Sequence, residues 1–588
     1  MRGLCMVLLS CSLILGVAAC GGGGSSTPPP PPPPSLTVSP ASATVGLGTT
    51  QQFTATTGVT PTTATWSVNG VQGGNSTVGT IDATGKYTAP ASFPSPDKFM
   101  VTASASGTTA NANLTVAFPN DNHVSQTGAI KLGTTGGNST DSTTTGTPPN
   151  QTVTCCSGTL GSLVTDGVNL FILSNNHVLD KSDHGTNGDP ITQPGLVDNN
   201  CAVGVVVAHL TKAATLKPTN GTNGPAPSNV DAAIAAIVNG SVDPSGNILD
   251  LGAAGPNSIA AAPPSSLGLA VPANVLAANE GVAKSGRSTG LTCSNLQSVN
   301  TSVSVDYNVS CGGAKAFTST FANQVVINGG NFSASGDSGS LVVTSDTARP
   351  VGLLFAGNTT STTANPIQDV VNALAPLTFA GTGGDHAVSC DPTATASSAS
   401  KTVGASAATL SAPEKDRVTT VKEKYASKLL GSPSVSDVNV GASVDNPQEG
   451  AVVITVRGAT PLPATLDGVR TRVVYANSPP PRAAVADIKR ATAIKEVHAQ
   501  GLMSQSGIQG VGVGVSDDNP AEPALVIYLV AGMPHPEIPA VMDGLRTKII
   551  EGDRFRAFGW GKETVKPPTC SPKQARALPK SLELPKLP

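Results

Sequence analysis

The sequence predicts a multidomain, mainly β protein, with a β-sandwich followed by a pair of β-barrels and two small α+β repeat modules. A chain of 588 residues is long enough for about three to five domains. Only 12% of the residues are charged and 3% are aromatic, while glycine contributes 64 residues, a composition typical of exported β-rich proteins. Short segments with period-two alternation recur in the first part of the chain, and an internal repeat occupies its C-terminal part.

The N-terminus has the pattern of an export signal. Residues 1–19 carry one early charge and an apolar run that is too short to span a membrane, as in a secretory signal peptide. The run Val17-Ala18-Ala19-Cys20 resembles a bacterial lipobox, a resemblance that implies lipid attachment to Cys20. Residues 20–35 form a glycine- and proline-rich linker, which suits an anchored ectodomain. The alternative is a plain signal peptide in which Cys20 is incidental. We expect an exported cell-envelope lipoprotein at the outer membrane or cell surface.

Residues 36–117 contain short alternating segments at roughly ten-residue spacing, which predicts a β-sandwich. The order of these segments resembles bacterial Ig-like domains, with Ser67-Val68-Asn69-Gly70 after Trp66 and a turn and strand at 85–90. The resemblance implies either a spacer or an adhesion or glycan-binding domain. We favour the spacer.

A nucleophile, a base and an orienting acid follow one another along the next part of the chain. Ser338 lies in Ser335-Gly336-Asp337-Ser338-Gly339-Ser340, where the glycines allow a tight turn that exposes the hydroxyl. This turn directs the N–H groups of Gly336 and Ser338 at one point, as an oxyanion hole requires. His177 ends an apolar, strand-like run and Asp231 opens another, so they can supply the base and its orienting carboxylate.

Each of these residues also has a simpler explanation. A Gly-Asp-Ser-Gly segment arises by chance in a glycine- and serine-rich chain, and Asp231 could be a loop residue before a buried strand. His184 and His209 lack a comparable setting and are better explained as surface or packing residues. The order His177, Asp231, Ser338, with separations of 54 and 107 residues, favours a catalytic triad between two β units.

The motifs resemble those of trypsin-like (chymotrypsin-fold) serine proteases over about residues 125–380, and we expect the protease domain at residues 120–380. The resemblance is carried by the stretches 284–292, 336–342 and 350–357, and it implies a chymotrypsin-like double β-barrel. Ser340 replaces the second glycine of the commoner pattern. No Ile-Val-Gly-Gly start precedes the first barrel, so we do not expect Asp337 to pair with a newly cleaved N-terminus.

The same resemblance implies a substrate pocket formed by Phe332, Phe355 and Gly357. Phe332 stands six residues before the nucleophile, at the base of the pocket in this family, and offers no carboxylate to a basic side chain. We therefore expect a small or medium apolar residue, rather than Lys or Arg, before the scissile bond.

The C-terminal part contains a linker, two repeats and a tail. Residues 381–415 are a linker rich in small residues, 416–478 and 489–556 are two copies of an α+β module, and 557–588 are a tail. Val421-Lys422-Glu423 matches Ile494-Lys495-Glu496 at an offset of 73. Gly510, Gly512 and Gly514 resemble a phosphate loop only superficially, because no helix signal follows, and a tightly packed strand is the better interpretation. The modules could dock substrate, inhibit, bind the cell wall or act as spacers.

The cysteines indicate disulfides rather than metal binding. An exported chain meets an oxidising compartment, and no Cys-x-x-Cys pair with a second ligand pair exists. We expect Cys293 and Cys311 to staple a hairpin, and one of Cys155 or Cys156 to pair with Cys201. A net charge of −3 gives no nucleic-acid signature, and neither a cofactor nor a metal is expected.

The sequence thus predicts a secreted, membrane-anchored serine endopeptidase that acts on proteins or peptides through His177, Asp231 and Ser338, without a cofactor. The alternative is a catalytically inactive protease-fold protein with a surface binding or adhesion role.

Overall fold

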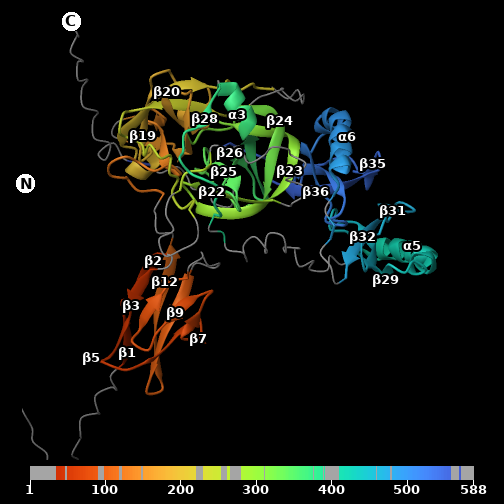
Figure 1. Cartoon of the computed structure of the whole chain (residues 1–588), viewed down its shortest axis with the longest axis horizontal. Helices are drawn as coiled ribbons and strands as arrows, with labels where there is room; N and C mark the ends of the chain where they lie inside the picture. The colour runs from red at the N-terminus through yellow and green to blue at the C-terminus, as the bar shows by residue number, and fades with distance from the viewer. Residues whose placement is uncertain are drawn as a thin grey trace, which may run out of the picture.

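In this computed structural model, the described residues are 35–46, 49–90, 98–117, 122–147, 150–219, 230–252, 261–264, 280–309, 311–374, 376–388, 390, 410–458, 460–476, 480–481, 483–557 and 569–570. The predicted signal peptide and Cys20 lie outside these residues. The described part is multidomain and mainly β, as the composition and alternation predict (Figure 1).

The N-terminal domain is entirely β and packs around one core. Its strands form sheets with the orders β1-β4-β5, β3-β10-β9-β8 and β2-β12-β11-β6-β7. Alternate residues of the longer strands are buried, and Phe53, Trp66 and Tyr87 lie in the shared core. The strands are β1 (Leu36–Ser39), β2 (Ser42–Gly46), β3 (Thr50–Gln52), β4 (Thr54–Thr57), β5 (Thr60–Pro61), β6 (Thr65–Val68), β7 (Val71–Gln72), β8 (Gly74–Asn75), β9 (Gly79–Ile81), β10 (Lys86–Thr88), β11 (Lys98–Ala105) and β12 (Thr108–Ala117).

The first half of the central body is an eight-stranded sheet of order β16-β13-β19-β20-β21-β18-β17-β28. Its elements are β13 (Thr134–Asn138), β16 (Gly158–Leu160), β17 (Ser162–Thr165), β18 (Leu170–Ser174), α1 (Asn176–Leu179), β19 (Pro190–Gln193), the 3-10 helix η1 (Leu196–Asn199), β20 (Val205–Ala213), β21 (Ala233–Ile237) and β28 (Thr378–Phe379). Beside it, β15 (Thr152–Cys155) pairs with β14 (Ser142–Thr145) and with β37 (Thr569–Cys570). Residues near the C-terminal end of the chain therefore lie against the first half of the body.

The second half contains a closed ring of strands. Its order is β22-β25-β26-β27-β24-β23, and the additional pairing of β22 with β23 closes the ring. The strands and the helix that follows them are β22 (Gly281–Gly286), β23 (Gly290–Tyr307), β24 (Phe317–Asn328), β25 (Leu341–Thr344), β26 (Pro350–Gly357), β27 (Ser361–Pro366) and α3 (Ile367–Leu374). The structure thus shows one closed ring and one eight-stranded sheet where the sequence predicts two barrels.

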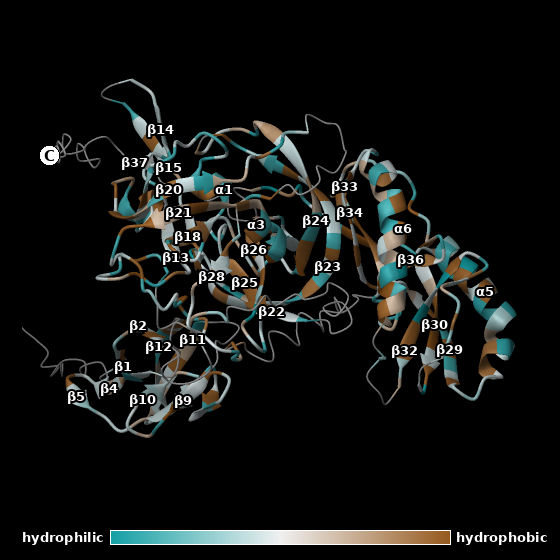
Figure 2. Ribbon diagram, turned by 45° about the horizontal axis from the view of Figure 1, so that its top comes forward, coloured by the Kyte–Doolittle hydropathy of each residue, from teal (hydrophilic) through white to brown (hydrophobic). Residues whose placement is uncertain are grey.

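The C-terminal repeats have the same order of elements. The first contains α5 (Ala412–Leu430), β29 (Val435–Ala442), β30 (Gly450–Val456), β31 (Thr465–Leu466) and β32 (Val469–Tyr475); the second contains α6 (Val485–Met503), β33 (Ile508–Val515), β34 (Pro523–Val530), β35 (Val541–Met542) and β36 (Leu545–Gly552). Both helices carry alternating hydrophilic and hydrophobic bands, and α6 buries Ile488, Ala491 and Leu502 (Figure 2). Each repeat can therefore cover its small sheet with one helix face.

The second repeat is joined to the central body by main-chain pairing. Strand β33 pairs with β23, so the ring continues into the repeat as one ten-stranded sheet. Gly512 lies where a Cβ would come within 2.9 Å of the Ser298 hydroxyl, so only glycine fits this close approach. The glycines of β33 thus serve packing between strands.

The disulfides correct part of the predicted pairing. Cys155 pairs with Cys201, but Cys293 pairs with Cys390 and Cys311 with Cys156. The predicted Cys293–Cys311 staple is wrong because both cysteines reach partners distant in sequence, which local spacing does not reveal. The three disulfides support an exported protein.

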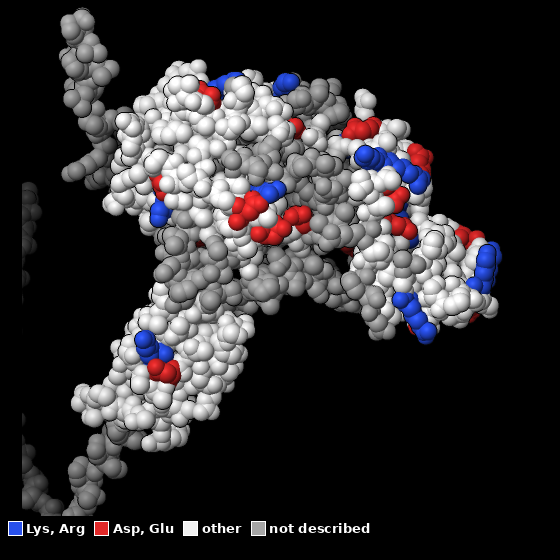
Figure 3. Space-filling model, viewed as in Figure 1, with Lys and Arg blue, Asp and Glu red and all other residues white. Residues whose placement is uncertain are grey.

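No described helix has the length and apolar character needed to cross a bilayer. Charged side chains are sparse over the central body and gather over the repeats (Figure 3).

Candidate functional site

His177 and Asp231 are brought together by the pairing of two strands. Strand β18 lies antiparallel to β21, with Ser174 opposite Ala233. His177 follows the end of β18 in the short helix α1, and Asp231 precedes the start of β21. The two residues therefore lie at the same end of this strand pair, where their side chains meet.

The two residues form a fully buried pair. His177 Nδ1 lies 2.5 Å from Asp231 Oδ2, and the His177 backbone N–H donates to Asp231 Oδ1 at 3.2 Å. The Asn175 side-chain amide donates to the Asp231 carbonyl at 2.7 Å, which fixes the loop that carries the acid. The contact at Nδ1 leaves Nε2 as the ring atom for proton exchange with a nucleophile.

Tyr307 is a second partner of Asp231 that the sequence analysis does not identify. Its hydroxyl donates to Asp231 Oδ2 at 2.7 Å from the end of β23. Burial, followed by the nearby Asp231 charge, raises the pKa of Tyr307 well above its ordinary value. The hydroxyl therefore remains protonated and donates to the carboxylate, so Asp231 is held from both halves of the body.

Two glycines give the Ser338 turn its shape. Gly336 and Gly339 have φ values of +98° and +95°, a region that side chains disfavour. A Cβ on Gly336 would come within 2.5 Å of Arg287 Nη1, and one on Gly339 would overlap Ser174 Oγ and the Thr159 carbonyl. The Gly-Asp-Ser-Gly sequence thus fits a turn that is tightly packed on both sides.

The Ser338 turn is attached to both halves of the body. Thr159 N–H donates to the Ser338 carbonyl at 2.8 Å, and Gly339 N–H donates to the Leu354 carbonyl at 2.9 Å. Gly339 lies against Ser174, three residues before His177, so the Ser338 turn packs on the strand end that leads to the His177–Asp231 pair. Ser338 is only 2% exposed, and its hydroxyl donates to the Ala557 carbonyl at 3.3 Å.

The carboxylate of Asp337 forms a buried ion pair with Lys284, a residue in the middle of the sequence rather than a chain terminus. Lys284 Nζ lies 3.5 Å from Asp337 Oδ2, and both side chains are fully buried. Thr289 Oγ1 donates to Asp337 Oδ2 at 2.7 Å, and Ser288 N–H donates to Oδ1 at 2.8 Å. Burial lowers the pKa of Lys284, while the Asp337 charge acts in the opposite direction. Lys284 thus provides a positive partner that requires no chain cleavage.

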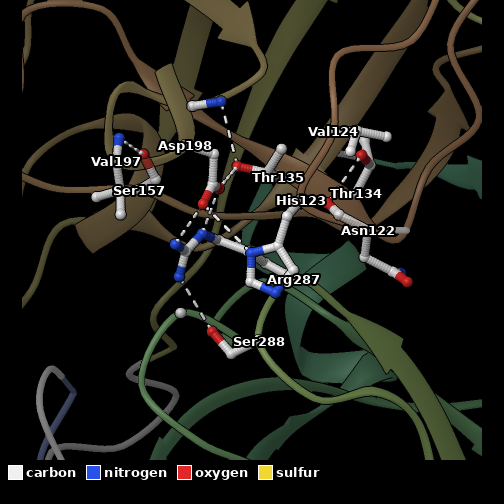
Figure 4. A network of polar contacts seen from close by, with 12 residues as sticks. Asn122, His123, Val124, Thr134, Thr135, Ser157, Val197, Asp198, Arg287 and Ser288 are labelled. Atoms are coloured by element: carbon white, nitrogen blue, oxygen red, sulfur yellow. Dashed lines mark hydrogen bonds and ion pairs between the residues drawn. The ribbon is translucent and has the colours of Figure 1, made fainter. Parts of the chain in front are cut away.

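Arg287 lies against the same turn at Gly336, and its ion pair with Asp198 is seen in Figure 4. Its guanidinium makes two bonds to Asp198 of η1, Nε to Oδ2 at 2.6 Å and Nη2 to Oδ1 at 2.7 Å. Burial raises the pKa of Asp198, but hydrogen bonds from His123 and Arg287 outweigh burial and hold it below its ordinary value. The Ser288 hydroxyl accepts from Arg287 Nη1 and donates to the Ser335 carbonyl at 2.5 Å. The ion pair thus links the two halves of the body beside the Ser338 turn.

The predicted pocket residues occupy different surroundings. Phe332 is 2% exposed and packs with Val282 and Leu354, whereas Phe355 is fully buried and packs with Phe321 in another cluster. Gly357 exchanges two backbone hydrogen bonds with Arg556. The pocket therefore remains a prediction.

One group of side chains in the described residues has metal-ligand atoms close together. Asp141, Cys156 and Cys311 place them within 4.8 Å of one another. The two sulfurs are joined in a disulfide, so they are not thiolate ligands.

Three features of the site have little signal in the sequence. Tyr307 is one apolar position of a long alternating strand, and the residues around Lys284 carry no local pattern that indicates a buried lysine. The contact of Ala557 with Ser338 joins residues 219 apart.

Comparison with known proteins gives no family for this chain. No family model matches it, and no curated protein matches it. Among solved structures, it is similar to the N-terminal eight Ig domains of Down Syndrome Cell Adhesion Molecule (DSCAM) isoform 1.30.30, with 10% identity. This match covers 50% of the present chain and 38% of that chain at a TM-score of 0.13, so no fold is inferred from it.

The family assignment drawn from the motifs is therefore wrong. With no matching family and no protease among these findings, the chain is not placed among trypsin-like (chymotrypsin-fold) serine proteases, nor described as a bacterial lipoprotein with an N-terminal bacterial Ig-like domain. The physical reason is that short motifs specify local turns and side-chain chemistry, which recur on unrelated folds.

Proposed function

We propose that this protein is a serine endopeptidase that hydrolyses peptide bonds through Ser338, His177 and Asp231. The observation that carries the proposal is the buried His177–Asp231 pair, 2.5 Å apart, beside a glycine-flanked serine turn. A carboxylate that orients an imidazole next to a serine is the arrangement that makes a hydroxyl nucleophilic.

In the proposed mechanism, Ser338 Oγ attacks the substrate carbonyl while His177 Nε2 accepts its proton. Asp231 holds the imidazole through Nδ1 and stabilises the imidazolium that forms, and Tyr307 keeps the carboxylate in place. The N–H groups of Gly336 and Ser338 stabilise the oxyanion. His177 then protonates the leaving amine, and water attacks the acyl-enzyme with His177 again acting as base.

Lys284 supports the proposal for the oxyanion hole. The Asp337 peptide lies between the two proposed N–H donors, and its carboxylate is held by Lys284, Thr289 and Ser288. A buried charge with several partners resists displacement, because breaking the pair would leave an uncompensated charge. The turn is thus preorganised without a zymogen step.

The proposal extends to location and architecture. We propose that the protein is attached to a membrane by lipid on Cys20, that residues 36–117 are an Ig-like β-sandwich, and that the eight-stranded sheet curls into a barrel beside the closed ring. The disulfides and the ring support export and the barrel pair, respectively. Cys20→Ser should move the protein from the membrane fraction to a soluble exported fraction. A variant that still resists carbonate extraction from membranes would contradict the anchor.

The alternative function is surface binding or adhesion by a catalytically inactive protein. Cleavage of an unbiased peptide library by purified wild-type chain and by Ser338→Ala distinguishes the two. We expect Ser338→Ala to lose about a million-fold in kcat, with wild-type cleavage following small or medium apolar residues. Equal cleavage by the two proteins would reject the triad, and a profile dominated by Lys or Arg would reject the pocket.

A further inference from the structure

The second repeat ends in an extended segment that lies at Ser338. We call this segment, Asp553–Ala557, the C-terminal strap. Arg556 N–H donates to the Gly357 carbonyl at 3.1 Å, and Gly357 N–H donates to the Arg556 carbonyl at 3.1 Å. This is an antiparallel bridge at the end of β26, and Ser338 bonds to the next carbonyl along the strap.

The strap is bonded on its other side as well. Asp306 N–H donates to the Phe555 carbonyl at 2.9 Å, and Ala557 N–H donates to the Asp306 carbonyl at 3.1 Å. The Phe555 N–H donates to Gln509 Oε1 at 3.0 Å. Every backbone polar group from Phe555 N–H to the Ala557 carbonyl therefore has a partner, as in a peptide bound by strand addition.

The side chains of the strap alternate like those of a bound strand. Phe555 and Ala557 are fully buried, while Arg556 between them is exposed. Phe555 packs in the cluster that contains Phe355 and Tyr528, and its ring centroid lies 5.7 Å from that of Tyr528.

The start of the strap is anchored by Asp553. Its Oδ1 accepts from the backbone N–H and the hydroxyl of Thr359, each at 2.7 Å, and its carbonyl accepts from Asn358 Nδ2 at 3.0 Å. Because the pairing of β33 with β23 fixes the second repeat on the body, the strap is delivered to this position by the fold.

We propose that the C-terminal strap is an intramolecular pseudosubstrate that fills the peptide-binding groove of the Ser338 site. The groove binds extended peptides with an aromatic residue two positions before a small residue, and such peptides compete with the strap. The proposal rests on the proposed function for the role of Ser338.

The contact at Ser338 favours a resident inhibitor over a substrate caught before cleavage. The Ser338 hydroxyl donates its proton to the Ala557 carbonyl, whereas nucleophilic attack requires that proton to be directed at His177. The strap must therefore leave before Ser338 can react with another peptide.

Peptide binding tests the proposal independently of hydrolysis. A fluorescein-labelled peptide with the sequence of residues 553–557 is titrated into full-length Ser338→Ala, alone or combined with Arg556→Pro or Arg556→Ala. Proline removes the N–H that bonds to Gly357, while alanine keeps the backbone bonds and loses only an exposed side chain. We expect Arg556→Pro to bind the labelled peptide about tenfold or more tightly. In the parent, the tethered strap competes with the peptide at a high effective concentration, and the proline weakens that competition. Arg556→Ala should bind like the Ser338→Ala parent.

Equal affinity in all three folded proteins would overturn the pseudosubstrate. Hydrogen exchange on the unmodified chain provides a test that no substitution can disturb. Excess peptide should accelerate exchange of the Arg556 and Ala557 amides, and unchanged protection with the groove saturated would also overturn the proposal.

A serine-reactive fluorophosphonate separates this proposal from the proposed function. If Arg556→Pro binds peptide more tightly but is never labelled at Ser338, the groove stands and the peptidase assignment fails. If Ser338 is labelled at the same rate with and without Arg556→Pro, and peptide affinity is unchanged, the peptidase stands and the pseudosubstrate fails.

Discussion

At the residue scale, the carboxylate of Asp231 has a donor on each side. His177 comes from the first half of the body and Tyr307 from the second, and both contact Oδ2. All three side chains are buried, so the orientation of the imidazole depends on these bonds rather than on water. In the proposed mechanism, Tyr307 is therefore a positioning residue.

Tyr307→Phe should lower kcat about tenfold with little change in KM, because a hydrogen bond to a charged group contributes about 1.5–3 kcal/mol and part of it orients His177. The measurement is steady-state peptide hydrolysis. Tyr87→Phe is the matched control, since its side chain is buried and its hydroxyl donates to the Val78 carbonyl at 2.8 Å in the N-terminal domain, outside the central body. Equal losses of kcat in the two variants would reject a positioning role.

The residues of the proposed triad can be selected from local sequence patterns, but the residues that contact and support them cannot. Ser338 and His177 stand in local patterns of turn and strand end, which short-range sequence specifies. Tyr307 contacts Asp231, which lies 76 residues away in sequence, and Lys284 contacts Asp337, which lies 53 residues away. A local sequence pattern does not reveal contacts of this range. The Cys293–Cys390 disulfide escaped prediction for the same reason.

At the scale of elements, the Ser338 turn depends on two positive-φ glycines in crowded surroundings. Gly336→Ala should lose activity by about a hundredfold, because a Cβ there displaces Arg287 and shifts the turn by a fraction of an ångström to about 1 Å. Gly329→Ala is the control, since Gly329 has φ +91° but no heavy atom within 4 Å of an added Cβ. Both variants should lose about 1–2 kcal/mol of stability from the backbone. Activity that falls equally in both would contradict the role of the crowding.

The contact between the repeats has an approximate two-fold character that the sequence repeat does not reveal. Arg470 Nη1 donates to the Thr547 carbonyl at 2.7 Å, and Arg546 Nη1 donates to the Thr471 carbonyl at 2.7 Å. Asp445 accepts from Asp517 N–H at 2.7 Å in the same contact. The matching segments of the two repeats thus bind each other.

Stability of this contact should fall as pH rises. Burial, followed by the Asp518 and Asp517 charges, raises the pKa of Asp445 to about 7. Its unfolded value is about 3.9, so between roughly pH 4 and 7 the folded state binds more protons and loses stability with rising pH. Asp445→Asn should make this slope shallower and leave the part due to Asp518, whose pKa burial also raises. Exchange of the Ile549 amide, which bonds to the Asp445 carbonyl, can follow the change. Exposed Asp437→Asn is the control. An unchanged slope in Asp445→Asn would contradict the assignment.

At the scale of the whole molecule, composition and alternation predict the fold class correctly but do not predict how the domains pair with one another. The chain is multidomain and mainly β, and each repeat has one helix over a small sheet. The sequence does not reveal that β33 extends the ring into a ten-stranded sheet, because edge pairing depends on backbone shape rather than on side-chain pattern. This pairing holds the second repeat against the ring, from where the strap reaches Ser338.

The central claim is that Ser338 is a nucleophile activated by His177. Its most direct measurement is mass-spectrometric mapping of the fluorophosphonate adduct on the native full-length chain and on Arg556→Pro. We expect a single adduct on Ser338 that forms faster in Arg556→Pro and is absent after denaturation and in His177→Ala. The claim would be contradicted if the folded native chain and folded Arg556→Pro both acquire no adduct on Ser338. Equal labelling of Ser338 in the His177→Ala variant would also contradict it.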